Sequence, residues 1–349
     1  MKVKTLTPLW TGGVGGKVDR IHETGLLGSM RWWYEVLVRG LGGRVCERSD
    51  ECKFDVDKYF KSEASDEGKR LRDAGLCDVC QVFGATGWKR RFRLSVKESE
   101  IYDAIIQHPI EAERVYETQG KKHTPAWYFP SFPNTKPNTP KSGSFEIQIQ
   151  SLYGDFPSDV IMGLIQFIAD WGALGARAQM GFGVIEPIDD RWDTGPLYKW
   201  LATTADNQEY YEWPSLRNVF FTQIKMQNVR EVDTFNLKYD LRQLFSANQD
   251  VRHFIMGTTA GDNKMAAKVK ISRPYGDGQI RIWGWIPEKA GCYDNEWNRE
   301  KIVEVIHNHL IHEYDLETWR EFNSPRDTAT VNITDPREFL QSLLGIEGG

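Results

Sequence analysis

Several features that mark other classes of protein are missing from this sequence. The opening residues, MKVKTLTPLW, lack the apolar run of a secretory signal, and no stretch nears the roughly 18 consecutive apolar residues of a membrane span. Cysteine is sparse, and its total of five is an odd number. In a long chain without an export signal, this pattern favours reduced thiols or metal binding over disulfides. We therefore expect a cytoplasmic protein with no membrane partner.

Catalytic and nucleotide-binding motifs are missing as well. The sequence holds no His-Asp dipeptide, no paired acid cluster, no triad spacing and no GxxxxGKS/T phosphate loop. These absences predict a protein that is not an enzyme and requires no cofactor. The net charge of −5 excludes a chain that is basic throughout. A local basic groove is compatible with it, because binding follows the distribution of charge.

The residues that are present describe a globular protein. Apolar residues make up 40% and charged residues 27% of the 349 residues, enough for a large core and two domains of ordinary size. The aromatic share is 12%, with 13 tryptophans. Such residues supply either core bulk or flat surfaces on which bases stack.

Hydrophobic patterns predict the same order of elements twice. In residues 1–190 the order is strand, helix, strand, strand, helix, strand, the ferredoxin-like (RRM-like) arrangement of an α+β domain. This domain carries a cysteine-bearing insertion at 43–87 and a long loop at 98–143. After a linker at 191–216 a similar order begins in 217–349, but its last strand is not visible, so we expect a degenerate second copy. The open face of such a sheet is a common platform for RNA.

A glycine-rich segment, GALGARAQMGFG, spans residues 172–183. It follows a predicted helix and precedes a predicted strand, the reverse of a dinucleotide site, where phosphate meets a helix N-terminus. One interpretation is a helix C-cap with a tight turn. The other is a loop laid against RNA, in which Gly181 and Gly183 let the backbone approach and Arg177 and Gln179 donate to phosphate or sugar. The number of glycines favours the loop against RNA.

Four stretches resemble the RAMP superfamily of CRISPR-associated proteins, and within it the first-numbered RAMP subunit of the type III-B (Cmr) effector complex. They are TPLWTGGVGGKVDRIHETGLLGSMRWWYEVLVRGLGG, CDVCQVFGATGWKRRFRL, GALGARAQMGFGVI and RPYGDGQIRIWGWIP. The resemblance implies a non-catalytic subunit with two ferredoxin-like domains. It also implies guide RNA, bound near its 3′ end, and other RAMP subunits as partners, with target RNA as a further candidate. The RNA surface of the family is basic and lies by the glycine loop.

A run of basic residues supports an RNA surface of this kind. Lys89, Arg91 and Arg93 share one face of the predicted strand 88–97. Repulsion between like charges favours an anionic partner there, while a simply solvated face is the alternative.

Two further groups are less specific. Arg31 and Arg39 flank Glu35 at steps of four, so an ion-pair ladder competes with anion binding on that helix. Lys17, Arg20 and His22 follow the flexible TGGVGG and could order on RNA. His22 also carries the alternative function, a metal-independent endoribonuclease that processes CRISPR RNA with a histidine as general acid–base. A protein-assembly adaptor is the third hypothesis.

Four of the cysteines predict a structural zinc site. Cys46, Cys52, Cys77 and Cys80 form the pattern C-x5-C-x24-C-x2-C, in an insertion with few apolar residues to stabilise it. The first spacing is looser than is usual for zinc, and buried reduced thiols are the alternative.

Overall fold

The first sheet forms from the strands with the clearest alternation. The computed structural model describes residues 1–13, 18–48, 50–104, 110–118, 121–123, 126–127, 139–154, 156–204, 207–258 and 264–346. Its first sheet is antiparallel, in the order β2 (Phe92–Asp103), β7 (Lys141–Ser151), β1 (Lys2–Thr5), β8 (Ile185–Pro187). Phe145 and Ile147 are buried, while the alternate residues Glu146 and Gln148 lie on the outer face. Helices α1 (Glu23–Gly40) and α5 (Asp159–Trp171) pack on the buried face, which gives the predicted ferredoxin-like domain.

The second sheet repeats this connectivity. Its strands lie in the order β10 (Val269–Ile271), β11 (Gln279–Trp285), β9 (Val219–Lys225), β12 (Asp315–Glu321), with α7 (Glu231–Gln243), α8 (Gln249–Met256) and α9 (Arg299–Glu313). The prediction of two ferredoxin-like domains is confirmed, but the prediction that the second is degenerate is wrong, because β12 supplies the fourth strand. This strand escaped detection because a bulge between Leu316 and Thr318 breaks its alternation.

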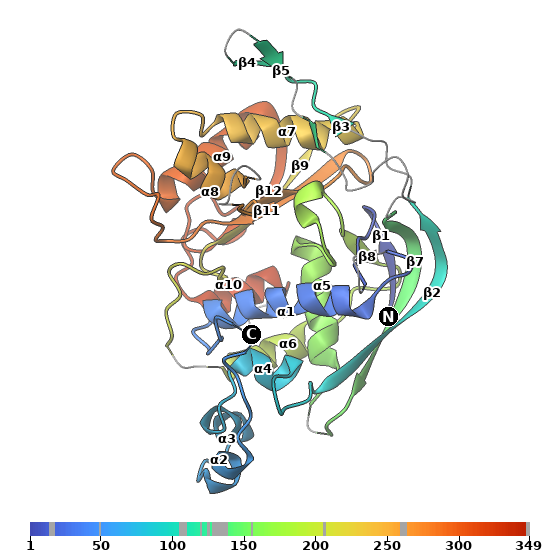
Figure 1. Cartoon of the computed structure of the whole chain (residues 1–349), viewed down its shortest axis with the longest axis vertical. Helices are drawn as coiled ribbons and strands as arrows, with labels where there is room; N and C mark the ends of the chain where they lie inside the picture. The colour runs from blue at the N-terminus through green and yellow to red at the C-terminus, as the bar shows by residue number, and fades with distance from the viewer. Residues whose placement is uncertain are drawn as a thin grey trace.

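The helices of the first domain lie between the two sheets (Figure 1). The rings of Trp33 on α1 and Trp171 on α5 lie 6.0 and 5.6 Å from the ring of Phe221 on β9. The C-terminal helix α10 (Pro336–Leu343) returns to this layer and packs beside α6 (Gly195–Ala202), which lies in the predicted linker. Among the described residues, the second sheet is therefore covered on both faces, and the outer face of the first sheet has no helix on it.

Two insertions leave the body of the molecule. Helices α2 (Val56–Lys61) and α3 (Glu67–Asp73) project at one end, while α4 (Asp78–Phe83) of the same insertion packs against α1. The paired strands β4 (Tyr116–Thr118) and β5 (Lys121–His123) project at the other end (Figure 1). The second insertion also contains β3 (Ile110–Glu111) and β6 (Ala126–Trp127). It crosses to α7, where Arg114 forms an ion pair with Asp240 at 2.8 Å. None of the described helices has the length and apolar character that crossing a bilayer requires.

Candidate nucleic-acid interface and metal site

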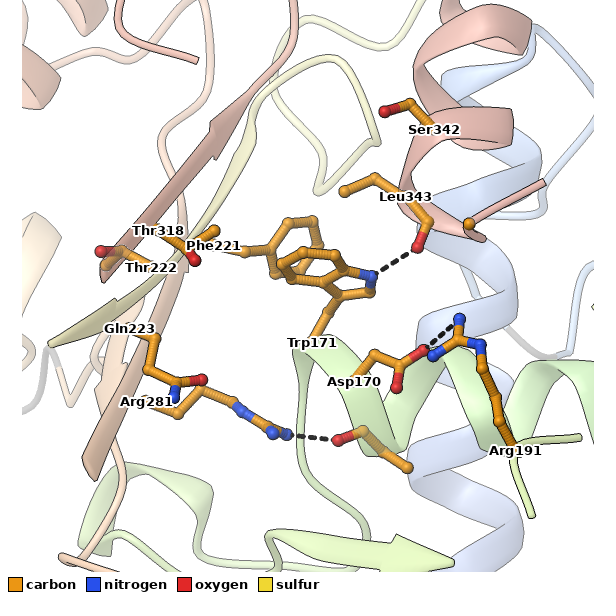
Figure 2. Close-up of a pocket in the computed structure, with 12 residues that line it drawn as sticks. Asp170, Trp171, Arg191, Phe221, Thr222, Gln223, Arg281, Thr318, Ser342 and Leu343 are labelled. Atoms are coloured by element: carbon orange, nitrogen blue, oxygen red, sulfur yellow. Dashed lines mark hydrogen bonds and ion pairs between the residues drawn. The ribbon is translucent and has the colours of Figure 1, made fainter. Parts of the chain in front are cut away.

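The glycine loop begins at a helix end that the second domain caps. The guanidinium of Arg281 on β11 donates to the carbonyl oxygen of Ala169 at 2.7 Å (Figure 2) and to that of Gly172 at 3.0 Å. These carbonyls end α5, where the helix carries partial negative charge. The loop is thereby fixed between the two domains, and the buried Arg281 has a structural role.

The glycines of the loop make close contacts with the protein's own backbone. Gly181 and Gly183 are buried and have φ of 84° and 94°, a conformation that favours glycine. A Cβ at Gly183 would lie 2.0 Å from the carbonyl oxygen of Leu174, and one at Gly181 would lie 2.6 Å from the backbone nitrogen of Arg273. The prediction that Gly181 and Gly183 let RNA approach the backbone is therefore corrected. The absence of a side chain at these positions makes room for the protein's own backbone at Leu174 and Arg273.

Arg177 is held in an unusual position at the tip of the loop. It has φ of 59° and precedes the short 3-10 helix η2 (Ala178–Met180). Its guanidinium carbon lies 4.1 Å from the ring centre of Trp10, and partial burial lowers its pKa. Its carbonyl oxygen accepts a hydrogen bond from the Met180 nitrogen at 2.8 Å, whereas among the described residues its guanidinium has no hydrogen-bond or ion-pair partner. Gln179 is exposed, and its carbonyl oxygen accepts a hydrogen bond from Lys238 at 2.7 Å.

The two arginines of α1 are used inside the protein, so the structure corrects their predicted RNA contacts. Arg39 is 5% exposed, forms an ion pair with Glu35 at 3.4 Å and donates to the carbonyl of Pro214 at 3.2 Å. Arg31 forms an ion pair with Glu35 at 3.1 Å and donates to the sulfur of Cys80 at 3.2 Å. The ion-pair ladder that competed with anion binding is present, and both guanidinium groups are held by groups of the protein.

The basic run before and along β2 is divided. Strand β2 begins only at Phe92, so the alternation does not extend back to Arg91, which is 4% exposed and donates to the carbonyl of Gln81 at 3.3 Å. Arg91 thus cannot contribute to an exposed cationic face. Lys89 and Arg93 are exposed and stay candidates for RNA contact.

The outer face of the first sheet carries charges of both signs. Lys97 lies opposite Glu146 in the ladder, and Lys4 forms an ion pair with Glu186 at 2.8 Å. These carboxylates weaken the field that a phosphate backbone would meet on this face. The face is therefore a poorer candidate than the glycine loop.

The N-terminal candidates lie close together. Arg20 is exposed and forms an ion pair with Glu23 at 3.1 Å. A ring nitrogen of His22 lies 2.8 Å from a carboxylate oxygen of Asp19. A Cβ at Gly13 would lie 2.5 Å from the His22 ring, so the two residues are in contact. Lys17 lies outside the described residues.

The four cysteines converge on one point. The sulfurs of Cys46, Cys52, Cys77 and Cys80 all lie within 4.8 Å of one another, and those of Cys46 and Cys80 are 3.7 Å apart. The backbone N–H groups of Cys77 and Cys80 donate to the sulfurs of Cys52 and Cys77 at 3.3 and 3.4 Å. Hydrogen bonds from the other three thiols, that of Cys46 first, lower the pKa of Cys77. This group could hold a metal ion.

A cavity of about 400 Å³ lies between α5, the second sheet and α10 (Figure 2). Arg191 forms an ion pair with Asp170 at its wall, at 2.7 Å, and the indole nitrogen of Trp171 donates to the carbonyl of Leu343 at 2.8 Å. The bond from Trp171 joins α10 to the end of α5, and the ion pair joins Arg191 to the same end. They make the cavity part of the packing between the domains.

No sequence pattern indicated three lysines on α7 and at β10, the elements of the second domain that meet the glycine loop. Lys238 lies on α7, while Lys268 and Lys270 lie at and within the edge strand β10. Lys238 is at least 30 residues from the other two lysines in the sequence, so only the tertiary fold brings the two elements together. Trp10 was likewise missed, although it supplies the ring beneath Arg177.

Two ferredoxin-like domains in tandem, the first closing through a helix, a glycine loop and a strand, define the class of fold. The sequence profile of the RAMP superfamily matches residues 2–186. The chain belongs to the RAMP superfamily.

Two solved structures are similar to this chain. One is apo Cmr1 from Pyrococcus furiosus, at 13% identity and a TM-score of 0.44, covering 90% of this chain and 97% of that one. The other is a chain of a type III-B Cmr-beta complex bound to cognate target RNA and AMPPnP in the presence of single-stranded DNA. It has 11% identity and a TM-score of 0.43, covering 88% of this chain and 97% of that one. No curated protein matches the sequence.

Proposed function

We propose that this RAMP protein is a non-catalytic RNA-binding subunit of a type III-B CRISPR ribonucleoprotein. In this proposal it holds the backbone of the guide RNA near its 3′ end, beside other RAMP subunits, with target RNA as a second candidate. The observation that carries the proposal is the guanidinium of Arg177, which lies on Trp10 without a partner among the described residues.

The geometry of Arg177 suits a phosphate ligand. A guanidinium presents several N–H donors in one plane and binds phosphate in a bidentate manner. The ring of Trp10 restricts the motion of the side chain, so less entropy is lost when RNA binds. The positive φ of Arg177 is a local strain of the kind that functional sites retain. Contacts of this type give binding that depends on salt and only weakly on sequence.

The test replaces Arg177 by glycine, which accepts positive φ and keeps the loop conformation. RNA affinity is measured by fluorescence anisotropy with unstructured single-stranded RNA at two salt concentrations. We expect Arg177→Gly to weaken binding about tenfold and to reduce the salt slope by about one. The matched control is Arg48→Gly, because Arg48 is exposed and paired with Asp50 in the projecting insertion.

The assembled complex separates RNA binding from a purely adaptor role. Photo-crosslinks from RNA to Arg177 or to the segment with Lys89 and Arg93 support the proposal. Crosslinks that avoid this chain, together with unchanged affinity of Arg177→Gly, would leave an assembly adaptor as the better account.

We also propose that the four cysteines bind a structural zinc ion. Zinc bound by four thiolates has Zn–S distances of about 2.3 Å, which place the sulfurs about 3.8 Å apart. The sulfurs of Cys46 and Cys80, 3.7 Å apart, are consistent with this spacing. Four thiolates leave a net negative charge, and the guanidinium of Arg31 lies beside Cys80 to offset it. Elemental analysis of the purified chain should find one zinc per molecule, whereas a metal-free chain that keeps its fold would favour reduced thiols.

One observation bears on the endoribonuclease alternative. The carboxylate of Asp19 would orient the imidazole of His22, as a general acid–base requires. That alternative predicts cleavage of labelled repeat RNA without metal and its loss in His22→Ala. RNA that stays intact after long incubation with the wild type removes the alternative.

A further inference from the structure

Lys238 and Lys270 lie on the two elements of the second domain that meet the glycine loop, and Lys268 lies just before β10. The amine of Lys238 on α7 donates to the carbonyl of Gln179 at 2.7 Å. The amine of Lys270 on β10 donates to the carbonyl of Lys268 at 3.1 Å, and the amine of Lys268 donates to that of Phe254 at 3.1 Å. Each amine is thus positioned by a main-chain oxygen.

The structure fixes these amines at the seam between the two domains. Strand β10 is the edge strand of the second sheet, and it lies against η2 of the glycine loop. The backbone nitrogen of Arg273, just beyond β10, donates to the carbonyl of Gly181 at 3.0 Å. Both sides of the seam are therefore held by direct hydrogen bonds, and Lys238 belongs to the same junction as Arg177.

The electrostatic setting of the seam favours an anion. Burial, reinforced by Lys268 and Lys238, lowers the pKa of Lys270 to about 7. Burial and the charge of Arg242 lower the pKa of Lys238 to about 8. The two charged groups that lower the pKa of Lys270 are both lysines. Protonation of Lys270 therefore adds a positive charge to a site that is already positive. A phosphate placed there would relieve this repulsion and favour the charged amines.

We infer that Lys238 and Lys270 form a seat for a phosphodiester group of RNA at the seam between the two domains. This inference rests on the proposed RNA-binding function and deepens it, because it extends the RNA path from Arg177 onto the second domain. The covered second sheet cannot offer its face to RNA, so an edge and a helix are the surfaces that remain for contact.

The experiment measures RNA affinity of the full chain with Lys238→Met and Lys270→Met. Methionine keeps most of the side-chain volume and removes the charge. We expect each variant to weaken binding to unstructured single-stranded RNA about fivefold to tenfold and to lower the salt slope by about one. The matched control is Lys301→Met, since Lys301 is exposed on α9 and pairs with Glu304 at 3.0 Å. It should change affinity less than about twofold.

Thermal stability separates binding from a structural role. Removing a partly buried cation from a positive site should leave Tm of Lys270→Met unchanged or higher at neutral pH. A loss of RNA affinity together with a drop in Tm would mean that Lys270 acts through the fold, and this would overturn the seat. Lysine acetylation read by mass spectrometry gives a second measurement, in which RNA should protect Lys238 and Lys270 but not Lys301. Equal labelling with and without RNA also overturns it.

The arms of the experiment keep the two proposals apart. If Arg177→Gly weakens binding and both methionine variants bind like the wild type, the seat is wrong and the RNA-binding function stands. If the wild type itself shows no salt-dependent RNA binding, the proposed function fails. Protection of the two lysines by inorganic phosphate but not by RNA would assign the seat to a free anion and overturn the inference.

Discussion

Replacement of Gly183 by alanine tests whether the glycine loop is set by its own packing. The added Cβ would lie 2.0 Å from the carbonyl oxygen of Leu174, at a φ of 94°. The carbonyl must move by about 1 Å to reach an ordinary contact, which breaks the hydrogen bond from the Leu174 nitrogen to the Gly183 oxygen at 2.8 Å. Positive φ costs alanine about 1–2 kcal/mol, and the overlap and the lost bond add about 2 more.

The expected total is a loss of about 3–4 kcal/mol in the free energy of unfolding of the first domain, or roughly 6–16 °C in Tm. The assay is thermal and urea unfolding followed by tryptophan fluorescence. The control is Gly28→Ala, because a Cβ at this exposed position of α1 meets nothing within 4 Å. It should stabilise the helix by up to about 1 kcal/mol. If Gly183→Ala melts with the wild type yet loses RNA binding, the packing argument is wrong and the loop reverts to an RNA-facing role.

Three further outcomes are expected. Arg177→Gly should change the free energy of unfolding by less than about 1 kcal/mol, since relief of positive φ offsets the lost stacking on Trp10; a large loss in urea unfolding contradicts this. Arg31→Met should weaken zinc binding about tenfold or more in competition with a chelator, and unchanged affinity would remove Arg31 from the metal site. The pKa of Lys270 is about 7 in the folded chain, against 10.5 for an ordinary lysine. Between pH 7 and pH 10.5 the unfolded chain therefore binds more protons than the folded chain, so the contribution of Lys270 to the free energy of unfolding rises with pH. Unfolding at a series of pH values should therefore find Lys270→Met more stable than the wild type near pH 7 and equal to it near pH 10.5.

The sequence predicts helices and strands well where apolar residues follow one helical or strand period. Alternation over 144–152 and the buried stripe over 155–172 predict β7 and α5, since each is set by local hydrophobic spacing. Strand β12 was missed because its bulge shifts the register and leaves few apolar residues in phase.

Functional residues were harder to predict, because their environment depends on distant segments. The charge pattern around Arg91 suggested a continuous strand face, but the strand starts one residue later and buries it. The wide spacing from Cys46 to Cys52 counted against a metal site, whereas a bridge between Lys53 and Thr86 brings Cys52 back toward Cys77. No linear pattern predicts such a closure.

The order of the layers restricts where RNA can lie. In an isolated ferredoxin-like domain the open sheet face is the usual RNA platform. Here the second sheet is buried against α1 and α5, as the contact of Trp33 with Phe221 requires. The first sheet keeps its outer face, but there Lys97 and Lys4 already lie beside the carboxylates of Glu146 and Glu186. The junction of the glycine loop with the second domain brings cations together, because Arg177 lies on Trp10 and Lys238 donates to the carbonyl of Gln179. An RNA backbone that follows the positive potential would therefore cross from one domain to the other at this seam.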